Sequence, residues 1–590
     1  MAAPKVLIDH SGIGPQVPHS ELVAALEKAG ASAVVLESLD NLTAISRIID
    51  ELETQSVCVI DGALLTGQTM VDAILAERST GLAALVRKTP SPQINHAARV
   101  TSKRIVSSST ELHRVTSPTH ELLGVIRLEN SPSVIQALKD SSKYLESLDQ
   151  QLNLVDLVTL ILVRSGHEVF VLEPSGICER NPSDVESVLS ELLAQDEARV
   201  KFGRALRTND GFYSTFVLRK LSRFVTRVAI WRGWTPNQIT VASLAISFVA
   251  SIFFATGNRT LLAIGAILVQ LAIIVDCSDG EVARYTGVSS ALGAWLDAAT
   301  DRIKEYVMYA ALALGASRHH ENLWTLVFVL IVLQTVRHLS DYNFVAVRGA
   351  RDARIPTVAL NHMVDDGKAS AGSLMDTSES LNSRRAVYWI KRVIYFPIGE
   401  RWLVITVGAL LGSPKLIFTS LLIFGSGALI YVSVGRFMRS RSWNHPQAQS
   451  GCDIVERQID AGPLMQWIFD DGAHPLSGRF GWSAPSLARL FELGLVAVVC
   501  HAHPIAFWWL FAVAFHHYDT LYRSLSGHEF PRKLTRLGLG VEGRTLVLLL
   551  SSIGFLIPLK ISLVLAGGYF TVLFVGYASA QWIRELQTSS

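Results

Sequence analysis

Residues 276–301 read DCSDGEVARYTGVSSALGAWLDAATD, and this stretch with four aspartates lies between long apolar segments. A membrane span ordinarily excludes such groups, because a carboxylate at the bilayer centre costs roughly 2.5 to 3.5 kcal/mol on insertion scales. Two carboxylates about 5 Å apart also repel by about 3 kcal/mol at an effective dielectric constant near 20. The stretch therefore predicts that a positively charged species binds between these aspartates.

The spacing of the aspartates places them on two helix faces. Asp276 and Asp279 are three residues apart, and Asp297 and Asp301 are four apart, so each pair lies on one side of a helix. Two helices that turn such pairs toward a shared groove can hold one or two divalent cations, which prefer oxygen ligands, at about 2.0 to 2.1 Å for magnesium. The cations would keep open positions for phosphate oxygens.

Three small residues and one basic residue accompany the aspartates. Gly280 and Ala283 share the face of the first pair and Gly293 that of the second, so the helices or a bulky ligand can come close. Arg284 follows directly. A single aspartate near a helix end is more often a cap or a surface charge, but four in register with these small residues favour a binding site.

The complete spacing, D-x2-D-G-x2-A-R-x8-G-x3-D-x3-D, resembles at every position the signature of the CDP-alcohol phosphatidyltransferase family. The resemblance implies a six-helix membrane domain that moves a phosphatidyl or phospho-polyol group from a CDP-linked donor to an acceptor hydroxyl. CMP is released, and the product serves phospholipid or polar headgroup biosynthesis. The flanking sequences are similar to the branch with inositol-type or other phospho-polyol substrates. A homodimer is also implied.

The resemblance implies roles for individual residues. Asp276, Asp279, Asp297 and Asp301 would hold two ions, Mg²⁺ or Mn²⁺, and Asp301 would take the proton of the acceptor hydroxyl. The implied CDP-binding residues are Asn237, Thr240, Asp276, Gly280, Ala283, Arg284 and Gly293. Asn237 could instead cap the first membrane helix.

Three charged residues are candidates for the acceptor site, namely Arg337, Asp341 and Arg401. Arg337 and Asp341 are four residues apart, so they could equally form a structural ion pair. Arg401 stands at a predicted helix start, where its planar guanidinium could bind an acceptor phosphate. Alternatively, it could extend to the membrane surface, as basic residues near span ends do.

Composition indicates an integral membrane protein with a separate soluble part. Of the 590 residues 49% are hydrophobic and 18% charged, and the mean hydropathy is +0.32, in a chain too long for one domain. A net charge of +2 argues against a nucleic-acid partner. The five cysteines have no paired spacing, which indicates neither a disulfide framework nor a zinc site. The N-terminus has no signal-peptide pattern and is expected in the cytoplasm.

Residues 1–200 are predicted to form a soluble α/β domain. Short runs rich in β-branched residues alternate with amphipathic stretches such as 20–29, which is typical of βαβ units around a mostly parallel sheet. The expected strands are 6–8, 33–36, 57–60, 83–86 and 169–172.

The order of these elements resembles the nucleotidyltransferase-like domain of bifunctional inositol-phosphate cytidylyltransferase/phospho-inositol transferases. The Gly-rich loop of that domain is missing, because only SGIGP at 11–15 follows the first strand, and a lone GxG is more often a plain turn. Asp61, at a strand end, could bind a metal or form a turn. We therefore expect a degenerate domain with a regulatory or structural role.

Residues 201–235 are predicted to be a basic amphipathic segment on an anionic membrane surface. Residues 236–440 are expected to form the phosphotransferase domain, with spans near 238–256, 260–282, 292–315, 322–346, 401–419 and 420–436, each near the required length. The distribution of basic residues places the aspartates and the N-terminal domain on the cytoplasmic side, in a bacterial plasma membrane. The polar loop 347–395 is expected to be mobile.

Residues 441–590 extend the chain beyond a six-span unit. A polar segment, 441–484, precedes four further predicted spans, near 486–503, 504–522, 544–559 and 561–582. HHYD at 516–519 could be a proton or metal site, although polar residues at the membrane interface are the commoner explanation. The sequence predicts no function for this extension.

Three functions are compatible with these features. The first is an active CDP-alcohol phosphotransferase. The second is a bifunctional enzyme whose N-terminal domain also makes the CDP-alcohol, against which the missing Gly-rich loop argues. The third is a non-catalytic membrane scaffold or ion-binding transporter. An ion pathway would need polar residues along several spans, whereas these gather at one membrane face, and the enzyme is therefore favoured.

Overall fold

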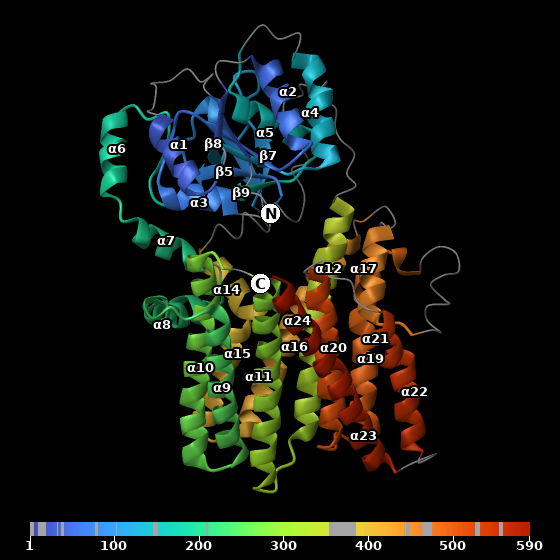
Figure 1. Ribbon diagram of the computed structural model, residues 1–590. Coiled ribbons are helices and arrows are strands. Elements are labelled where there is room, and N and C mark those ends of the chain that lie inside the picture. Colours follow the sequence, from blue (N-terminus) through green and yellow to red (C-terminus); the bar gives the residue numbers. More distant parts are fainter. Residues whose placement is uncertain are drawn as a thin grey trace. The chain divides into compact units, whose positions relative to one another are not determined.

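The fold is described from a computed structural model of the chain (Figure 1). The structure describes residues 5–9, 19–31, 33–36, 40–76, 81–101, 103–145, 151–207, 210–288, 290–352, 385–441, 443, 449–462, 475–525, 532–553 and 558–589. These residues fall into two compact units, one up to Ala205 and one from Leu206 onward. The predicted turn at 11–15 and most of the predicted mobile loop, 353–384, lie outside the described residues.

The first unit is built on an eight-stranded sheet of order β2-β1-β3-β8-β5-β9-β7-β6. Its strands are β1 (Lys5–Asp9), β2 (Ala33–Leu36), β3 (Val57–Asp61), β5 (Ala83–Lys88), β6 (Ala97–Thr101), β7 (Arg104–Ser108), β8 (His120–Leu128) and β9 (Val169–Leu172). A two-stranded ribbon pairs β4 (Leu64–Thr66) with β10 (Cys178–Arg180).

All five expected strands are present, but the prediction of a mostly parallel sheet is wrong. Parallel pairing is limited to β1 with β2, β1 with β3, and β5 with β9 among the described strands. The central strand β8 runs antiparallel to both β3 and β5. It escapes prediction because Gly124, with φ +79°, interrupts its apolar run, and glycine normally weakens a strand.

Helices pack on both faces of this sheet. They are α1 (His19–Lys28), α2 (Asn41–Leu52), α3 (Gln68–Ala76), α4 (Pro132–Leu145) and α5 (Leu154–Arg164). Two further helices, α6 (Val185–Ala194) and α7 (Glu197–Ala205), contact β4 and α3 instead. Alternate strand residues point to opposite faces, so Leu7 joins a core with α2, α4 and α5, while Val6 and Ile8 join a core with α1 and α3.

The second unit is helical. Its first helices are α8 (Arg219–Arg232), α9 (Pro236–Ala255), α10 (Arg259–Thr286), α11 (Ala291–Ser317), α12 (Trp324–Asp352), α14 (Arg385–Tyr395), α15 (Ile398–Leu410) and α16 (Pro414–Arg441), and a π-helical turn, Ser214–Leu218, precedes α8. Among the described residues, five helices of this unit are long and apolar enough to cross a membrane, or six if the bent pair α14 and α15 counts as one span.

The predicted span at 401–419 is wrong. The helix α15 ends at Leu410, and α16 begins at Pro414. Gly412 turns the chain between them with φ +71°, a conformation that favours glycine, and proline starts the next helix readily because the first helical N–H has no partner. Residues 414–419 therefore belong to the following span. The short α15 instead follows α14 at an angle of 68°.

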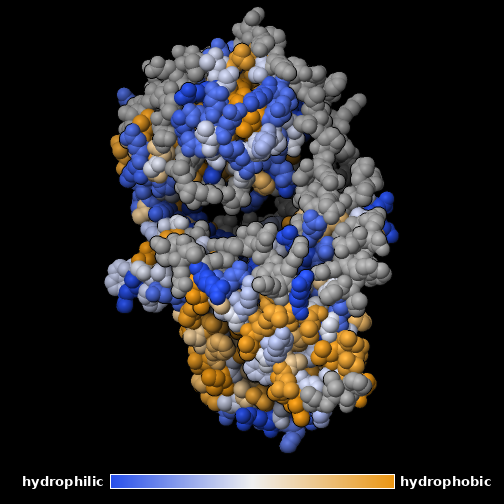
Figure 2. Space-filling view, turned by 45° about the vertical axis from the view of Figure 1, so that its right-hand side comes forward, coloured by the Kyte–Doolittle hydropathy of each residue, from blue (hydrophilic) through white to orange (hydrophobic). Residues whose placement is uncertain are grey.

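The outer surface of this helical unit is apolar. Figure 2 shows hydrophobic side chains gathered over the helices of this unit, with hydrophilic residues at the bottom of the view. Ile252, Ile267 and Ile423 point outward and are more than 60% exposed, at 64%, 63% and 68%. Exposed apolar surface on this scale marks contact with lipid, and the chain is an integral membrane protein.

The C-terminal extension continues the helical unit. It contains α17 (Gln449–Ile459), α19 (Ala484–Val499), α20 (Ala506–Leu525), α21 (Arg532–Leu537), α22 (Gly540–Ser552), α23 (Leu559–Thr571) and α24 (Tyr577–Ser589), with a π-helical turn, Val572–Gly576, between the last two. The helix α19 packs on α12, and α20 packs on α11. One hydrophobic core therefore joins the extension to the preceding helices.

Candidate active site

The four motif aspartates lie where α10 and α11 meet, with α9 packed against both helices. Asp276 and Asp279 are on α10, and Asp297 and Asp301 are on α11. One carboxylate oxygen from each of Asp276, Asp279 and Asp297 lies within 4.8 Å of the other two. Three of the predicted metal ligands thus converge from two helices.

Helix α9 holds the Asp279 carboxylate in place. The Thr240 hydroxyl donates a hydrogen bond of 2.6 Å to Asp279 Oδ2, and the Gly280 N–H lies 2.5 Å from Oδ1. Thr240 and Asp279 are both buried. Hydrogen bonds to an ionised carboxylate are stronger than those between neutral groups, so these contacts fix the orientation of this side chain.

Lys304 is a functional residue that sequence reasoning missed. Its side chain is fully buried, and its ammonium group forms an ion pair with Asp276 and lies 3.1 Å from Asp301 Oδ1. It also donates to Ser243 Oγ at 3.2 Å. The available signal was a lysine three residues after Asp301, on the same side of the predicted helix.

The charges in this cluster do not balance. Four aspartates face one another, and Lys304 is the cation that forms ion pairs with them among the described residues. Thr240 and Gly280 contribute hydrogen bonds but no charge. Buried carboxylates without a positive partner are costly, and three converging carboxylate oxygens are suitable ligands for a hard divalent cation. The residues present therefore fit a divalent metal.

Gly280 and Gly293 lie where a larger side chain would come close to neighbouring side-chain atoms. A Cβ atom on Gly280 would lie 3.1 Å from Arg284 Nη1, so glycine leaves room for this guanidinium. A Cβ atom on Gly293 would lie 3.4 Å from Asn237 Oδ1, at the point where the start of α9 meets the start of α11. Ala283 is half-buried. Larger side chains at the two glycines would fill this space.

The possibility that Asn237 caps α9 is wrong. The N-cap is Thr235, whose hydroxyl accepts the N–H of Gln238 while the Gln238 side chain accepts the N–H of Thr235. This reciprocal arrangement satisfies two free N–H groups of the first turn, with Pro236 at the first helical position. The Asn237 side chain is therefore available for another contact.

Two of the acceptor candidates, Arg337 and Arg401, meet at the carbonyl oxygen of Phe396, and Arg401 also binds Glu305. Arg401 Nε donates to Glu305 Oε1 at 2.7 Å, and Arg302 Nη1 donates to Oε2 at 2.6 Å. Arg337 and Arg401 both donate to the carbonyl oxygen of Phe396, at 3.2 and 3.4 Å. Arg302 and Arg401 thus share one carboxylate, with Arg337 beside Arg401, and the excess of positive charge can attract an anion.

Two alternative predictions for the acceptor candidates are wrong, namely the ion pair between Arg337 and Asp341 and the extension of Arg401 to the membrane surface. Asp341 forms an ion pair with Arg436 and accepts a 2.8 Å hydrogen bond from the Tyr395 hydroxyl, so its partner is not Arg337. Arg401 is 2% exposed and does not extend to the membrane surface. Helix packing rather than sequence spacing selects these partners, because α14 to α16 approach α12 from far along the chain.

The juxtamembrane helix α8 is tied to the same end of α10. Glu281, which is fully buried, accepts hydrogen bonds from Thr226 Oγ1 at 2.6 Å, Ser222 Oγ at 3.0 Å and Arg219 Nη1 at 2.9 Å. The opposite side of α8 exposes aromatic and basic side chains, including Phe224 at 71%. This arrangement is typical of a helix that lies on a membrane surface.

Asp61 of the first unit is neutralised by the protein. Arg180 Nη2 lies 2.7 Å from Asp61 Oδ2, Asn153 Nδ2 donates to the same oxygen at 2.9 Å, and the Ala63 N–H donates to Oδ1 at 2.9 Å. Burial alone raises the pKa of Asp61, but the charge of Arg180 and these hydrogen bonds hold it below the ordinary value of 3.8. Arg180 also pairs with the buried Asp156.

A further group of possible metal ligands lies in the C-terminal extension. Asp460, His516 and His517 have ligand atoms within 4.8 Å of one another and are buried, so the prediction that 516–519 are interfacial polar residues is wrong. Arg489 Nη1 lies 2.6 Å from His517 Nε2, and Arg544 Nη1 lies 2.8 Å from Asp460 Oδ2. Two guanidinium groups among the same side chains oppose the binding of a cation.

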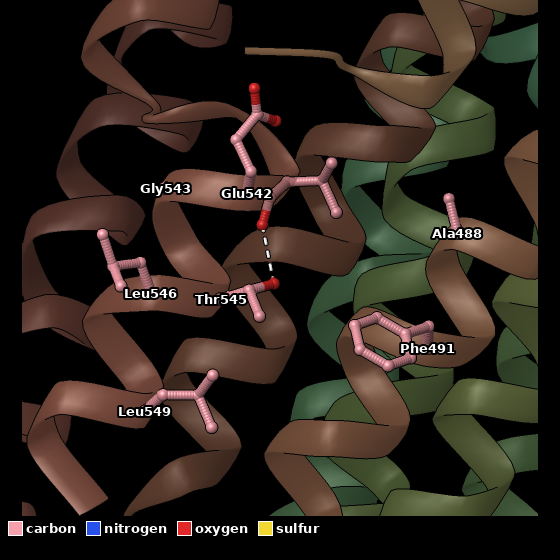
Figure 3. A pocket seen from close by; sticks show the side chains of 8 residues that line it. Ala488, Phe491, Glu542, Gly543, Thr545, Leu546 and Leu549 are labelled. Carbon is pink, nitrogen blue, oxygen red and sulfur yellow. Dashed lines mark hydrogen bonds between the residues drawn. The ribbon is translucent and has the colours of Figure 1, made fainter. Parts of the chain in front are cut away.

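A hollow of about 550 Å³ lies between α19 and α22 and is lined by Ala488, Phe491, Val541, Glu542, Gly543, Thr545, Leu546 and Leu549. Figure 3 shows the Glu542 carboxylate directed away from the apolar side chains of Phe491, Leu546 and Leu549. Glu542 instead accepts the Gly462 N–H at 2.8 Å, and Thr545 donates to the Val541 carbonyl. This hollow offers no group for catalysis.

Comparison with known proteins finds the same family as the spacing of the aspartates indicated. Residues 233–365 match the family described as CDP-alcohol phosphatidyltransferase, and residues 470–587 match one described as a family of unknown function (DUF5941). The chain is 34% identical over 158 residues to the bifunctional IPC transferase and DIPP synthase of Thermococcus kodakarensis, covering 26% of this chain and 34% of the relative. The first match confirms the resemblance expected from the signature.

A phosphatidylinositol phosphate synthase of Mycolicibacterium smegmatis is 33% identical over 122 residues, covering 20% of this chain and 54% of the relative. The chain thus spans about a third to about half of the length of these two relatives. The inositol-1-phosphate CTP transferase of T. maritima matches as a structure with a TM-score of 0.25 and 13% identity, covering 32% of this chain and 97% of that chain.

Proposed function

Because residues 233–365 belong to the CDP-alcohol phosphatidyltransferase family, we propose that the chain transfers a phospho-alcohol group from a CDP-linked donor to an acceptor hydroxyl, with release of CMP. The observation that carries this proposal is the carboxylate cluster of α10 and α11, in which Lys304 balances a single negative charge. Divalent cations that also bind the donor pyrophosphate would supply the missing positive charge.

Asp276, Asp279 and Asp297 would hold these cations, Mg²⁺ or Mn²⁺, through carboxylate oxygens. Bound divalent cations neutralise a pyrophosphate and stabilise charge on its attacking and leaving oxygens. Thr240 keeps the Asp279 carboxylate in one orientation through its 2.6 Å hydrogen bond. Lys304, between Asp276 and Asp301, lowers the repulsion that the cluster would otherwise have before substrate binds.

Asp301 is the proposed general base. Lys304 contacts its Oδ1 at 3.1 Å and thereby orients the carboxylate. As the acceptor oxygen attacks the donor phosphorus, the hydroxyl proton moves to Asp301, the bond from phosphorus to the CMP oxygen breaks, and CMP leaves. An aspartate suits this task because proton transfer needs a positioned base within hydrogen-bond distance of the hydroxyl.

The CDP group would lie beside the carboxylates, at the small residues. Gly280, Ala283 and Gly293 leave space there, and Arg284 stands next to Gly280, where its positive charge would offset phosphate charge. Asn237 and Thr240, at the start of α9, complete the proposed nucleotide site. Thr240 acts through Asp279, and Asn237 stands beside Gly293.

The proposed acceptor is a phosphorylated polyol of the inositol phosphate class. Arg302 and Arg401 share the Glu305 carboxylate, and Arg337 meets Arg401 at the Phe396 carbonyl. This excess of guanidinium groups supports an acceptor that carries a phosphate. The relatives include phosphatidylinositol phosphate and archaetidylinositol phosphate synthases, which supports the same class. Asp341 is a weaker candidate, because Arg436 and Tyr395 already contact both of its oxygens.

The first unit is proposed to be a degenerate nucleotidyltransferase-like domain. The side chain that could have bound a metal there, Asp61, is paired with Arg180 and hydrogen-bonded to Asn153. A guanidinium at 2.7 Å occupies the direction from which a cation would approach. This supports the single transfer reaction over a bifunctional enzyme that also makes the CDP-alcohol.

The carboxylate cluster is proposed to face the cytoplasm of a bacterial cell, at the plasma membrane. The basic helix α8 meets α10 at Glu281, two residues after Asp279, so basic side chains and carboxylates share one end of the helical unit. Basic segments next to spans remain on the cytoplasmic side. The N-terminal unit would lie on that side too, and a homodimer is the proposed assembly.

The test is CMP release by the purified protein in detergent with Mg²⁺ or Mn²⁺. CDP-diacylglycerol and CDP-inositol are offered as donors against inositol phosphate and other polyol phosphates. Asp301→Asn is the inactive variant, and Asp50→Asn, an exposed aspartate on α2, is the matched control. Metal-dependent release in the wild type and the control, but not in Asp301→Asn, supports the transferase. A protein that binds no CDP with metal would instead be a scaffold or transporter.

A further inference from the structure

Helix α11 presents two different faces to its neighbours. Asp297 and Asp301 face α10, whereas Trp295 is two residues, or about 200°, away from Asp297 around a helix with 3.6 residues per turn. Trp295 and Arg302 are seven residues apart, which returns to the same face after two turns. That second face packs against α20 of the C-terminal extension. The active-site helix therefore lies between α10 and α20.

The closest polar link between α11 and α20 is buried. The Trp295 indole Nε1–H donates a 2.9 Å hydrogen bond to Asp519 Oδ1, and Arg523 Nε donates to Asp519 Oδ2 at 2.8 Å. Trp295 is 7% exposed and Asp519 3%. A charged carboxylate inside a membrane protein is costly unless its partners are held in place, so this contact fixes the position of Trp295 relative to α20.

A second link joins α20 to the residue beside the proposed base. The Arg302 guanidinium lies 5.6 Å from the centre of the Tyr518 ring, a distance typical of a cation–π contact. The Tyr518 hydroxyl lies 2.7 Å from His338 Nδ1 of α12. Tyr518 thus connects α20 to two helices that carry proposed active-site residues.

Tyr522 lies one turn further along α20. Its ring packs against the hydrophobic core to which both α11 and α20 contribute. Tyr522 is four residues after Tyr518 and so lies on the same side of α20 as this residue. The contacts with Tyr518 and Asp519 are made by Arg302 and Trp295, which are two turns apart on α11, and this limits both translation and rotation of α11.

We propose that α20 supports the active site: through Asp519 and Tyr518 it fixes the rotation of α11 and thereby the positions of Asp297 and Asp301. Residues 470–587, which match a family of unknown function, would then be a required part of the transferase rather than an independent module. Trp295 and Asp519 are positioning residues, because they act through the helix backbone. The inference rests on the proposed function, since it concerns the same carboxylates.

The test uses the full chain in detergent and compares two tryptophans. Trp295→Phe removes the hydrogen bond to Asp519. Trp482→Phe is the matched control, because Trp482 is 1% exposed and its indole also donates a 2.9 Å hydrogen bond, to Ser440 Oγ. Asp519→Asn and the double variant with Trp295→Phe complete a double-mutant cycle. The measurements are Mn²⁺ affinity without substrate, by electron paramagnetic resonance, and kcat and KM for CMP release.

Trp295→Phe and Asp519→Asn are each expected to weaken Mn²⁺ binding and to lower kcat by about 10-fold, as loss of groups supporting metal ligands does. KM for the donor should stay unchanged. The double variant should be no worse than the worse single variant, because both substitutions act on the same contact. Trp482→Phe should stay within about twofold of wild type.

Two results would overturn the inference. If Trp295→Phe changes Mn²⁺ affinity and kcat no more than Trp482→Phe does while the wild type releases CMP, only the support by α20 is wrong. If the wild type neither binds Mn²⁺ nor releases CMP, the proposed function is wrong as well. Should Trp295→Phe fail to fold, as judged by gel filtration, the near-isosteric Asp519→Asn provides the same comparison.

Discussion

Two buried aspartate clusters among the described residues differ in how much of their negative charge the protein itself balances. In the first unit, Asp61 and Asp156 share the guanidinium of Arg180, which lies 2.7 and 3.0 Å from their oxygens. In the second unit, three aspartate oxygens converge within 4.8 Å, and Lys304 is the single cation paired with the four aspartates among the described residues. The first cluster has one cation for two carboxylates, whereas the second has one for four and needs further positive charge from outside.

The cluster in the C-terminal extension supports this distinction. Asp460, His516 and His517 satisfy the geometry of a metal site. Arg489 and Arg544 lie among them, however, and pair with Glu492 as well. Proximity of ligand atoms is therefore not enough to identify a metal site. The charge that the protein itself supplies decides whether such a cluster is structural or functional.

The largest effect is expected at the proposed base. Asp301→Asn should lower kcat for CMP release by about 10² to 10⁴-fold, the usual contribution of general acid–base catalysis. The melting temperature without metal should be unchanged or higher, because one repelling charge is removed. Steady-state kinetics and thermal unfolding of the same preparation measure both. Lower stability together with retained activity would contradict the functional assignment.

Arg180→Met should lower the stability of the first unit, whereas Asp301→Asn should leave stability unchanged or raise it. Arg180→Met leaves Asp61 and Asp156 buried without their cation, which costs about 3 to 5 kcal/mol of unfolding free energy, with no direct loss of metal binding. The matched control is Arg87→Met, whose partly exposed ion pairs with Glu121 and Glu179 should contribute less than about 1 kcal/mol. Amide hydrogen exchange at residues of the eight-stranded sheet measures the difference in unfolding free energy between the two variants. Equal effects of the two substitutions would contradict the comparison.

Metal removal should affect the second unit alone. At a concentration 100-fold above the dissociation constant, Mg²⁺ should stabilise the folded protein by about 2.7 kcal/mol, and EDTA should reverse this. Asp279→Asn should abolish the stabilisation. Amide exchange read separately for each unit measures where protection changes. Protection gained around Asp61 would show that the first unit also binds the metal.

The smallest expected effect is a loss of folding stability at acidic pH. Because the folded-state pKa of Asp61 is held below 3.8, this group contributes stability above pH 3.8 and loses the contribution as the pH falls through its folded pKa. The stability difference between wild type and Asp61→Asn should therefore be constant near neutral pH and shrink below 3.8. Unfolding in urea from pH 3 to 7 tests this, and a difference independent of pH over that range would contradict it.

Much of the candidate site followed from spacing within single helices. The separations of Asp276 from Asp279 and of Asp297 from Asp301 assign each pair to a helix face whatever the rest of the chain does. Asp301 is nevertheless not in the group of three whose oxygens converge, and the spacing did not reveal that Lys304 lies between Asp301 and Asp276. The mixed sheet was unpredictable for a related reason: β8 pairs with strands far along the chain, and pairing leaves no local pattern.

The sequence by itself determined the order of the units, the helices that carry the aspartates and the residue types that face one another, because these depend on local periodicity and hydropathy. Only the tertiary structure decided which carboxylates have a cation. Arg180 reaches Asp61 across 119 positions, and Asp519 reaches Trp295 across 224. Such partners are selected when elements pack against each other, since the cost of a buried charge depends on every group around it and not on its neighbours in the chain.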